Sequence, residues 1–316
     1  MTGNVSSTEK RPLVIILGAT ATGKTHLAIE IAQALNGEVV GADSRQIYRY
    51  MDIGTAKPTP EERAAAPHHL VDYVEPDDHI SLAQYQASAY AAIDNIHQRG
   101  KLPLLVGGTG QYITAVAEGW SIPEVPPNWP LRDELEHYAA QEGADALHAR
   151  LTAHDPVYAA KIHPNNIRRV VRALEICLTT GDTVTNLQRK QPPPYRMYTI
   201  GLQMDRENLY ARADHRFDMM MKAGFLDEVQ ALLNRGYERH LPAFSAVGYA
   251  ELLALLCDNA NLEEMIAQAK NNTHDFIRRQ EIWFRGHDHG ILWHNTDQNK
   301  TQSIVQSVAR WYEEQG

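Results

Sequence analysis

The sequence is poor in cysteine and has no long apolar run. Its 316 residues include two cysteines, Cys177 and Cys257, which stand far apart. Such a pair offers neither a disulfide framework nor the ligand spacing of a zinc site, and it suits a reducing compartment. No apolar run approaches the ~20 residues that span a bilayer, and the polar start MTGNVSSTEKRP lacks the apolar segment of a signal peptide. We therefore expect a soluble, cytoplasmic protein that does not associate with membranes.

Positive charge is also scarce. The chain has 30 Lys and Arg residues against 39 Asp and Glu residues, which gives a net charge of −9. Proteins that bind nucleic acids draw most of their non-specific affinity from Lys and Arg side chains that neutralise phosphates. A nucleic-acid role would therefore require a local basic face. Hydrophobic residues at 43% and charged residues at 22% are ordinary for a globular protein.

The first part of the chain alternates strand-like and helix-like segments. Short apolar runs at 13–18 (LVIILG), 38–43 (EVVGAD) and 102–108 (LPLLVGG) indicate buried strands. The stretches between them, 24–36 and 82–100, have helical spacing. This alternation predicts an α/β fold, a P-loop NTPase-like parallel sheet flanked by helices, in which ligands bind at the carboxyl ends of the strands.

Two proline-rich stretches, 122–130 (IPEVPPNWP) and 191–196 (QPPPYR), interrupt this rhythm. Helical segments at 131–151 and 165–181 lie between them, and strand character returns at 197–204. We therefore predict a helical insertion domain over residues 120–195. The α/β core would comprise residues 11–119 and 196–316, with a largely helical C-terminal third.

The stretch GATATGKT at 18–25 matches the phosphate-binding pattern G-x-x-x-x-G-K-[ST]. In such a loop, which is also the ATP-binding motif, successive backbone N–H groups converge on phosphate oxygens. Lys24 reaches the outer phosphates, and the Thr25 hydroxyl can ligate a phosphate-bound Mg²⁺. The following helix adds the positive end of its dipole. The pattern predicts a phosphate site without naming the ligand.

Asp43 ends the second predicted strand, which brings its carboxylate to the same edge of the sheet as the phosphate loop. It could ligate Mg²⁺, act as a general base, or cap a turn through its side chain. The third strand ends in LLVGGTG, with no acidic residue at the usual Walker B position, and no catalytic glutamate follows. The sequence is therefore poorly equipped for ATP hydrolysis.

Together these segments resemble the tRNA dimethylallyltransferases, isoprenyl transferases that modify the adenosine immediately 3′ of the anticodon. The resemblance covers nearly the whole chain in the right order. It rests on GATATGKT, DSRQIYRYMDIGTAKPT, PHHLVDYVEP, LPLLVGGTGQYI, KIHPNNIRRVVRALEI, RFDMMMKAGFLDEV and RRQEIWFRG.

The resemblance implies a set of roles. The phosphate loop would hold the diphosphate of dimethylallyl diphosphate, with Thr20 near the bridging oxygen and Mg²⁺ close to Thr25. Asp43 would be the general base on the adenine amine, and Arg216 would bind the diphosphate. The implied diphosphate-binding residues are Gly18, Ala19, Thr20, Ala21, Thr22, Gly23, Lys24 and Thr25. The implied tRNA-binding residues are Asp43, Ser44, Arg45, Gln46, Thr109, Arg132, Arg168, Arg169, Val170, Val171 and Arg172.

These roles imply that the partners are the anticodon stem-loop of tRNA and dimethylallyl diphosphate, and we expect a monomer. The chemistry agrees, because a carboxylate can take the proton of a weakly nucleophilic amine while cations stabilise the departing diphosphate. Two other enzymes remain open: an adenylate (cytokinin-type) isopentenyltransferase and an ATP-dependent small-molecule kinase. A non-catalytic nucleotide switch or RNA-binding module is a third possibility.

Several basic residues could have a structural role in place of binding RNA or diphosphate. Arg168 and Arg172 could form a solvated face that Glu175 partly neutralises. Arg216 could form a surface salt bridge with Asp214 or Asp218. The pair at 278–279 could serve the core or contact RNA.

Overall fold

The computed structural model describes residues 10–123, 125–258, 260–288, 290–298 and 300–314. Its contacts divide the chain into two compact units. Residues 1–117 and 194–316 form the first unit, called the core unit below, and residues 118–193 form the second, called the insertion. The insertion was predicted at residues 120–195.

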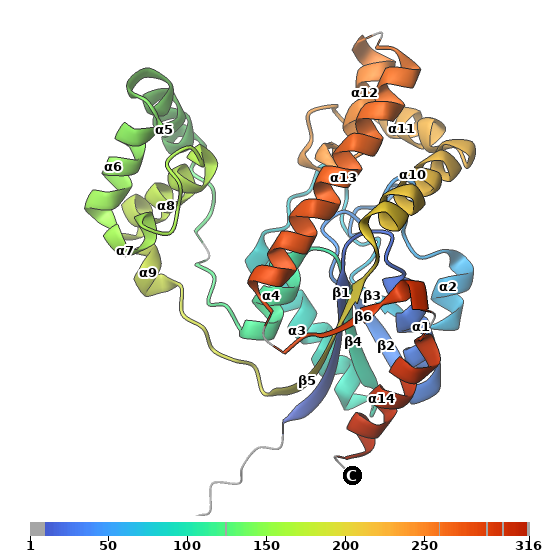
Figure 1. Cartoon of the computed structure of the whole chain (residues 1–316). Helices are drawn as coiled ribbons and strands as arrows, with labels where there is room; N and C mark the ends of the chain where they lie inside the picture. The colour runs from blue at the N-terminus through green and yellow to red at the C-terminus, as the bar shows by residue number, and fades with distance from the viewer. Residues whose placement is uncertain (1–9, 124, 259, 289, 299, 315–316) are drawn as a thin grey trace, which may run out of the picture. The chain divides into compact units, whose positions relative to one another are not determined.

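The core unit is built on a six-stranded sheet in the order β3-β2-β4-β1-β5-β6, in which all recorded strand pairs are parallel (Figure 1). The parallel α/β architecture expected from the sequence is therefore confirmed. Two short edge strands, β3 and β6, were not foreseen, because two and four residues carry too little pattern to be recognised. The strands are β1 (Arg11–Gly18), β2 (Gly37–Gly41), β3 (His68–His69), β4 (Leu102–Gly107), β5 (Tyr195–Gln203) and β6 (Leu292–Asn295).

Helices cover both faces of this sheet (Figure 1). On one face, α1 (Lys24–Leu35) and α14 (Thr301–Glu313) pack against alternate residues of β1 and β4. On the other face lie α3 (Leu82–Gln98), α4 (Gly110–Glu118) and the end of α13 (Leu262–Gly286). Burial on both faces explains why β1 and β4 read as continuous apolar runs.

A third apolar cluster lies beyond the carboxyl ends of the strands. It joins the 47–51 segment to the C-terminal helices, with the rings of Phe225, Phe244 and Tyr249 among its fully buried side chains. Besides α13, its helices are α10 (Arg206–Lys222), α11 (Phe225–Asn234), the 3₁₀ turn η1 (Pro242–Ser245) and α12 (Tyr249–Asp258). The short helix α2 (Pro60–Ala65) follows the 47–51 segment.

The insertion is helical, with its own buried core. Its helices are α5 (Trp129–Glu142), α6 (Ala144–His154), α7 (Pro156–Ala159), α8 (Ile167–Thr180) and α9 (Val184–Leu187). The single helical segment predicted over 131–151 is wrong, because Gly143, with φ of 94°, ends α5 and starts α6. Glycine adopts this backbone conformation without the steric cost that a side chain would bring.

Among the described residues, no helix is long and apolar enough to cross a membrane.

Glu175 is a fully buried carboxylate inside the insertion. It accepts hydrogen bonds from Arg132 Nε and Nη2, both at 2.9 Å, and from the Asn128 N–H at 2.6 Å, and it pairs with Arg172. Burial alone would raise the pKa of Glu175, but the bonds from Arg132, Asn128 and Arg172 outweigh it, so the pKa lies below its ordinary value. This carboxylate ties the start of α5 to α8.

Replacing Glu175 by Gln should destabilise the insertion by about 1.5–3 kcal/mol, because charge-assisted hydrogen bonds are lost in a buried place. Chemical unfolding and hydrogen exchange over residues 128–180 measure the effect. The Glu175 pKa is lowered on folding, so its stabilisation is present at neutral pH and disappears as the pH falls through that pKa. The difference between the two proteins should therefore shrink in acid.

Glu134→Gln on the exposed side of α5 is the matched control and should change stability by no more than about 0.5 kcal/mol. Equal stability of the wild type and the Glu175→Gln variant at neutral pH would show that Glu175 does not hold the insertion together.

Candidate active site

The phosphate loop lies between β1 and α1, at the carboxyl edge of the sheet. Gly23 has a φ of 95°, and a Cβ on Gly18 would lie 2.4 Å from the carbonyl oxygen of Leu202, so both glycines are required by the backbone. Lys24 Nζ donates to the carbonyl oxygens of Gly18 at 3.0 Å and Ala19 at 2.7 Å. The Thr22 hydroxyl donates to the Ala19 carbonyl at 2.8 Å. The loop is therefore closed on itself, with its lysine already folded over it.

Lys24 has an altered acidity in this position. Burial lowers its pKa to about 8, with Asp43 opposing the shift and Arg216 adding to it. An ammonium group without an anionic partner is costly to bury, which is the physical cause of the shift. A phosphate group would supply the missing negative charge.

A cavity of about 220 Å³ opens beside this loop. One part of its wall is polar, and the other consists of apolar and aromatic side chains from α10, α13 and the 245–247 segment. Of the described residues that line it, Asp43 is the only acid. The lining residues are Thr20, Ala21, Asp43, Arg45, Gly54, Thr55, Ala213, Arg216, Phe217, Met220, Ser245, Ala246, Val247, Thr273, Phe276 and Arg279.

Asp43 follows β2, whose pairing with β4 places it on the same edge of the sheet as the phosphate loop. Its Oδ1 accepts from the backbone N–H groups of Arg45 at 2.8 Å and Gln46 at 3.4 Å. The side chain therefore caps the next turn, which was one of the open alternatives, and it also lines the cavity. Its second oxygen, Oδ2, has no recorded hydrogen bond or ion pair with any described residue.

Arg216 reaches the cavity from α10. Burial lowers its pKa, while Asp43 opposes this shift and Arg212 adds to it. The two acids that could have held it at the surface are engaged elsewhere: Asp214 pairs with His274 at 2.8 Å, and Asp218 pairs with Lys270 at 2.7 Å. Within the described part of the chain, no hydrogen bond or ion pair is recorded for the Arg216 guanidinium. It lines the cavity with Asp43 as the nearby negative charge and without a direct ion pair among the described residues.

Three further side chains predicted to bind RNA, those of Thr109, Arg45 and Gln46, have hydrogen-bond partners within the protein. The Ser44 N–H donates to Thr109 Oγ1 at 3.0 Å, which ties the turn after β2 to the turn after β4. Arg45 donates to the Pro242 carbonyl at 2.8 Å and to Ser245 Oγ at 3.0 Å.

The Gln46 amide donates to the carbonyl oxygens of Thr55 at 3.1 Å and Ala56 at 3.0 Å. Each of these side chains has a structural partner, whatever else it contacts.

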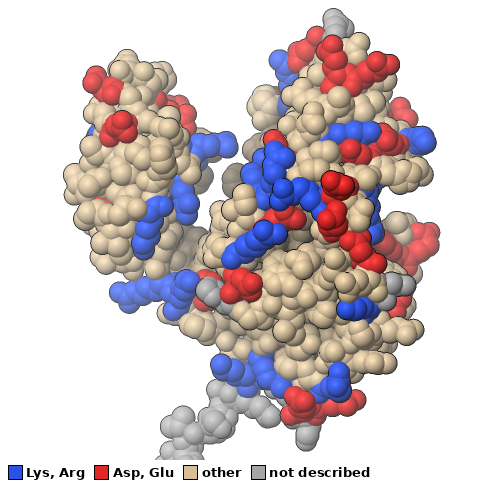
Figure 2. Space-filling model, in the orientation of Figure 1, with Lys and Arg blue, Asp and Glu red and all other residues tan. Residues whose placement is uncertain are grey.

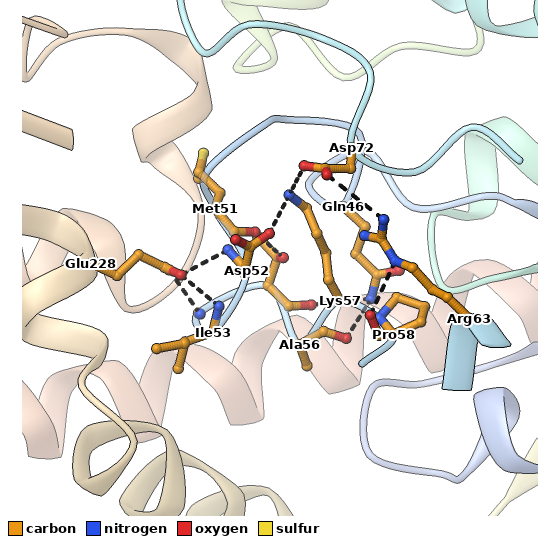
Figure 3. A network of polar contacts seen from close by, with 12 residues as sticks. Gln46, Met51, Asp52, Ile53, Ala56, Lys57, Pro58, Arg63, Asp72 and Glu228 are labelled. Atoms are coloured by element: carbon orange, nitrogen blue, oxygen red, sulfur yellow. Dashed lines mark hydrogen bonds and ion pairs between the residues drawn. The ribbon is translucent and has the colours of Figure 1, made fainter. Parts of the chain in front are cut away.

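The loop of residues 51–57, which supplies Gly54 and Thr55 to the cavity wall, is fixed by Glu228 of α11 (Figure 3). The Glu228 carboxylate accepts from the backbone N–H groups of Asp52 at 2.8 Å, Ile53 at 2.7 Å and Gly54 at 3.2 Å. A Cβ on Gly54 would lie 2.2 Å from the Phe225 ring. The loop therefore approaches α11 as closely as glycine allows.

Lys57 fixes the other end of the same loop. Its side chain is 2% exposed, and its ammonium donates to Asp52 at 2.7 Å and Asp72 at 2.6 Å (Figure 3). Lys57 is buried whereas Asp52 and Asp72 keep 60% and 35% exposure, so the buried ammonium depends on these two acids for its counter-charge. The cavity wall is thus preformed.

Helix α13 contributes residues whose roles the sequence did not settle. Arg279 lines the cavity, whereas Arg278 pairs with Asp275 on the surface. Figure 2 shows basic side chains gathered over the C-terminal half of α13. Gln280, which the sequence analysis missed, is buried and contacts the phosphate loop. Only its place in the RRQ motif could have drawn attention to it.

In the insertion, the predicted RNA-binding residues fall into three groups. Arg168 and Arg169 on α8 are exposed, with no recorded ion pair among the described residues. Arg132 and Arg172 bind Glu175, although both keep some exposure. Arg132 also lies 5.0 Å from the ring of Trp129, which is 60% exposed and was not predicted.

Val170 and Val171 require a correction. Both side chains are buried in the core of the insertion, at 0% and 2% exposure. They lie on the apolar face of α8, and the exposed arginines lie on another face. Their side chains therefore cannot contact RNA, and the two valines leave the predicted RNA-binding set.

No cluster of three or more His, Cys, Asp or Glu side chains that could hold a metal ion occurs in the described ranges. His68 and His69 form β3, where His69 bonds to Glu38 at 2.7 Å.

The chain is similar to known sequences from one protein family. Residues 46–287 match the family described as IPP transferase. The chain is 54% identical over 281 residues to the tRNA dimethylallyltransferase of Chloroflexus aggregans. The aligned residues cover 89% of this chain and 95% of the relative. It is 53% identical over 274 residues to that of Roseiflexus castenholzii, with coverage of 87% and 90%.

The solved structures that resemble this chain come from the same family. The full-length tRNA isopentenylpyrophosphate transferase of Bacillus halodurans matches with a TM-score of 0.72 at 41% identity, covering 97% of this chain and 98% of that one. A eukaryotic dimethylallyltransferase acting on tRNA matches with a TM-score of 0.78 at 27% identity, covering 95% and 78%. The chain therefore belongs to the tRNA dimethylallyltransferase family of IPP transferases.

Proposed function

We propose that the chain transfers a dimethylallyl group from dimethylallyl diphosphate to the exocyclic amine of the adenosine 3′ of the anticodon in tRNA, and releases diphosphate. The observation that carries this proposal is a single cavity lined by Thr20 of the phosphate loop, the Asp43 carboxylate and the unpaired cation of Arg216. Family membership supports the choice of tRNA as acceptor and of dimethylallyl diphosphate as donor.

Asp43 is suited to act on the acceptor. The adenine amine is a poor nucleophile because its lone pair is delocalised into the ring. As nitrogen bonds to the allylic carbon, its proton must leave. In the described part of the chain, Asp43 Oδ2 has no recorded partner that would prevent it from accepting that proton. Oδ1, fixed by the two backbone N–H groups, holds the carboxylate in place.

The donor side follows from the cations and the apolar wall. The bond that breaks joins the allylic carbon to the bridging oxygen of the diphosphate, and the electron pair leaves with that oxygen. Lys24, Arg216 and the loop N–H groups that remain free would stabilise the growing negative charge. The side chains of Phe217, Met220 and Phe276 offer an apolar surface for the five-carbon group.

Magnesium fits this arrangement as an ion carried with the diphosphate. Mg²⁺ usually keeps several waters and is held by substrate phosphates and one or two protein oxygens. The half-buried Thr25 hydroxyl at the start of α1 can supply one such oxygen. The ion would add positive charge on the leaving group.

The insertion would grip the anticodon stem through exposed basic side chains, chiefly Arg168 and Arg169. These can neutralise phosphates despite the net negative charge of the chain. The target base must leave its stack to reach Asp43, so base flipping belongs to the proposal. A monomer and the cytoplasm remain our expectations for its oligomeric state and its compartment.

The competing functions have less support. A free adenine nucleotide would need no separate helical unit with exposed arginines, which disfavours an adenylate isopentenyltransferase. A kinase would use the loop for ATP. However, β4 ends in Gly107 and the next residues are Gly108 and Thr109, so the acid that would hold the metal ion there is missing. Incubation with a labelled γ-phosphate donor, and separately with labelled dimethylallyl diphosphate and tRNA, distinguishes these activities.

Replacing Asp43 by Asn should lower the rate of prenyl transfer by about 10²–10⁴-fold, because the amide cannot take the proton. Asn can still cap the turn through its oxygen, so tRNA binding should be nearly unchanged. Mass analysis of tRNA nucleosides after incubation with dimethylallyl diphosphate measures transfer, and filter binding measures affinity. Asp78→Asn, at an exposed position, is the control. Full turnover by Asp43→Asn would remove Asp43 as the base.

Binding of dimethylallyl diphosphate should weaken as the pH rises through about 8, where Lys24 loses its proton. Below this pH the charged amine favours the diphosphate, and above it up to about tenfold in affinity is lost per pH unit if only the charged form binds. Titration calorimetry between about pH 7 and pH 9.5 gives the profile. Lys24→Arg keeps a charge throughout this range and should remove the inflection. The same inflection in that variant would assign it to another group.

A further inference from the structure

Gln280 of α13 joins two segments that lie far from it in the sequence. Its Oε1 accepts from the Thr20 N–H of the phosphate loop at 2.9 Å, and its Nε2 donates to the Gly108 carbonyl after β4, also at 2.9 Å. The side chain is 6% exposed and does not line the cavity. Because both ends of the amide are engaged and buried, Gln280 is poorly placed to touch either substrate.

The surroundings keep the amide close to its partners. A Cβ on Gly108 would lie 2.4 Å from Gln280 Nε2, and one on Gly110 would lie 2.1 Å from the Trp283 ring. Trp283 Nε1 donates to Thr114 Oγ1 at 3.2 Å. The two glycines therefore let one face of α13 rest directly on the turn between β4 and α4.

The two hydrogen bonds of Gln280 connect the part of the site that would hold the leaving group with the part that contains the base. Thr20, held through its backbone N–H, lines the cavity where the leaving group would lie. The turn that contains Gly108 also contains Thr109, which binds the Ser44 N–H next to Asp43. A single amide thus connects the segment that holds the leaving group with the support of the base.

We infer that Gln280 is a positioning residue for prenyl transfer: it sets the place of Thr20 relative to Asp43 by bridging the phosphate loop and the turn after β4. It acts through these two segments and not by contacting substrate. A neutral amide suits this position because it both donates and accepts without placing a negative charge beside the diphosphate. The inference rests on the proposed function, and its test includes a binding measurement that does not require transfer.

The first variant is Gln280→Met, which keeps the length of the side chain and removes both hydrogen bonds. We expect kcat to fall about tenfold or more, because small displacements of reacting groups are costly. The affinity for inorganic diphosphate should also fall, whereas the KM for tRNA should stay within about twofold. Gln268→Met, the same change at an exposed position of α13, is the matched control.

Coupling to Thr20 is tested with Thr20→Ala and the double variant. If Gln280 acts through Thr20, the loss of diphosphate affinity caused by Gln280→Met should shrink to less than about half in the Thr20→Ala background. Equal losses in the two backgrounds would mean that the residues act independently and would overturn the inference. So would an increase in the KM for tRNA alone, which would make Gln280 an RNA contact.

Gln280→Glu gives a second test that does not depend on the stability of the methionine variant. A protonated carboxyl group is close in shape to the amide, with one oxygen to accept from Thr20 and one hydroxyl to donate to Gly108. The ratio of variant to wild-type kcat should therefore rise about fivefold or more between pH 8 and pH 6 as the introduced carboxylate becomes protonated. A flat ratio would show that the two hydrogen bonds do not set the rate, and the inference would fail.

Discussion

The parallel pairing of β1, β4 and β2 is the constraint on which the site depends. Parallel strands end at the same edge of a sheet, so the phosphate loop after β1, the Gly108 turn after β4 and Asp43 after β2 come together without any helix having to carry them there. Burial of both faces under helices fixes the register of these strands. The sheet therefore brings the phosphate loop and the base to one edge, and contacts such as those of Gln280 fix them relative to one another.

Most polar side chains near the cavity form hydrogen bonds with backbone groups. The few that do not are therefore candidates for binding substrate. Gln46, Thr109 and Glu228 all have recorded backbone partners. Polar groups that line a cavity and have no protein partner are available to bind and orient a ligand. Oδ2 of Asp43 and the Arg216 guanidinium lack recorded partners among the described residues, and they share one cavity. Carboxylate and cation are the two charges that amine alkylation by a diphosphate ester requires.

The features that could be predicted from the sequence are those encoded by short, local patterns of residues. The phosphate loop, the four inner strands β2, β4, β1 and β5, and the position of Asp43 follow from short motifs and apolar runs. Glu228 and Gln280 were missed because their partners lie 174–176 and 260 residues away, which no local pattern records. Val170 and Val171 entered the predicted RNA-binding set with a whole motif, whereas the helical spacing that they share with Ile167 and Leu174 places their side chains on the apolar face of α8. Periodicity was the better guide there.

The chemistry at the end of β4 explains why this phosphate loop suits transfer better than hydrolysis. A hydrolytic loop needs an acid there to hold the metal and a group that orients water. Here the place beside Gly108 is taken by the neutral amide of Gln280, which leaves the positive charge of Lys24 and Arg216 uncompensated from that side. The one carboxylate in the cavity comes from β2, across the sheet edge from the loop. A base separated in this way from the leaving group can take a proton from an acceptor placed between them, which is the geometry that alkyl transfer demands.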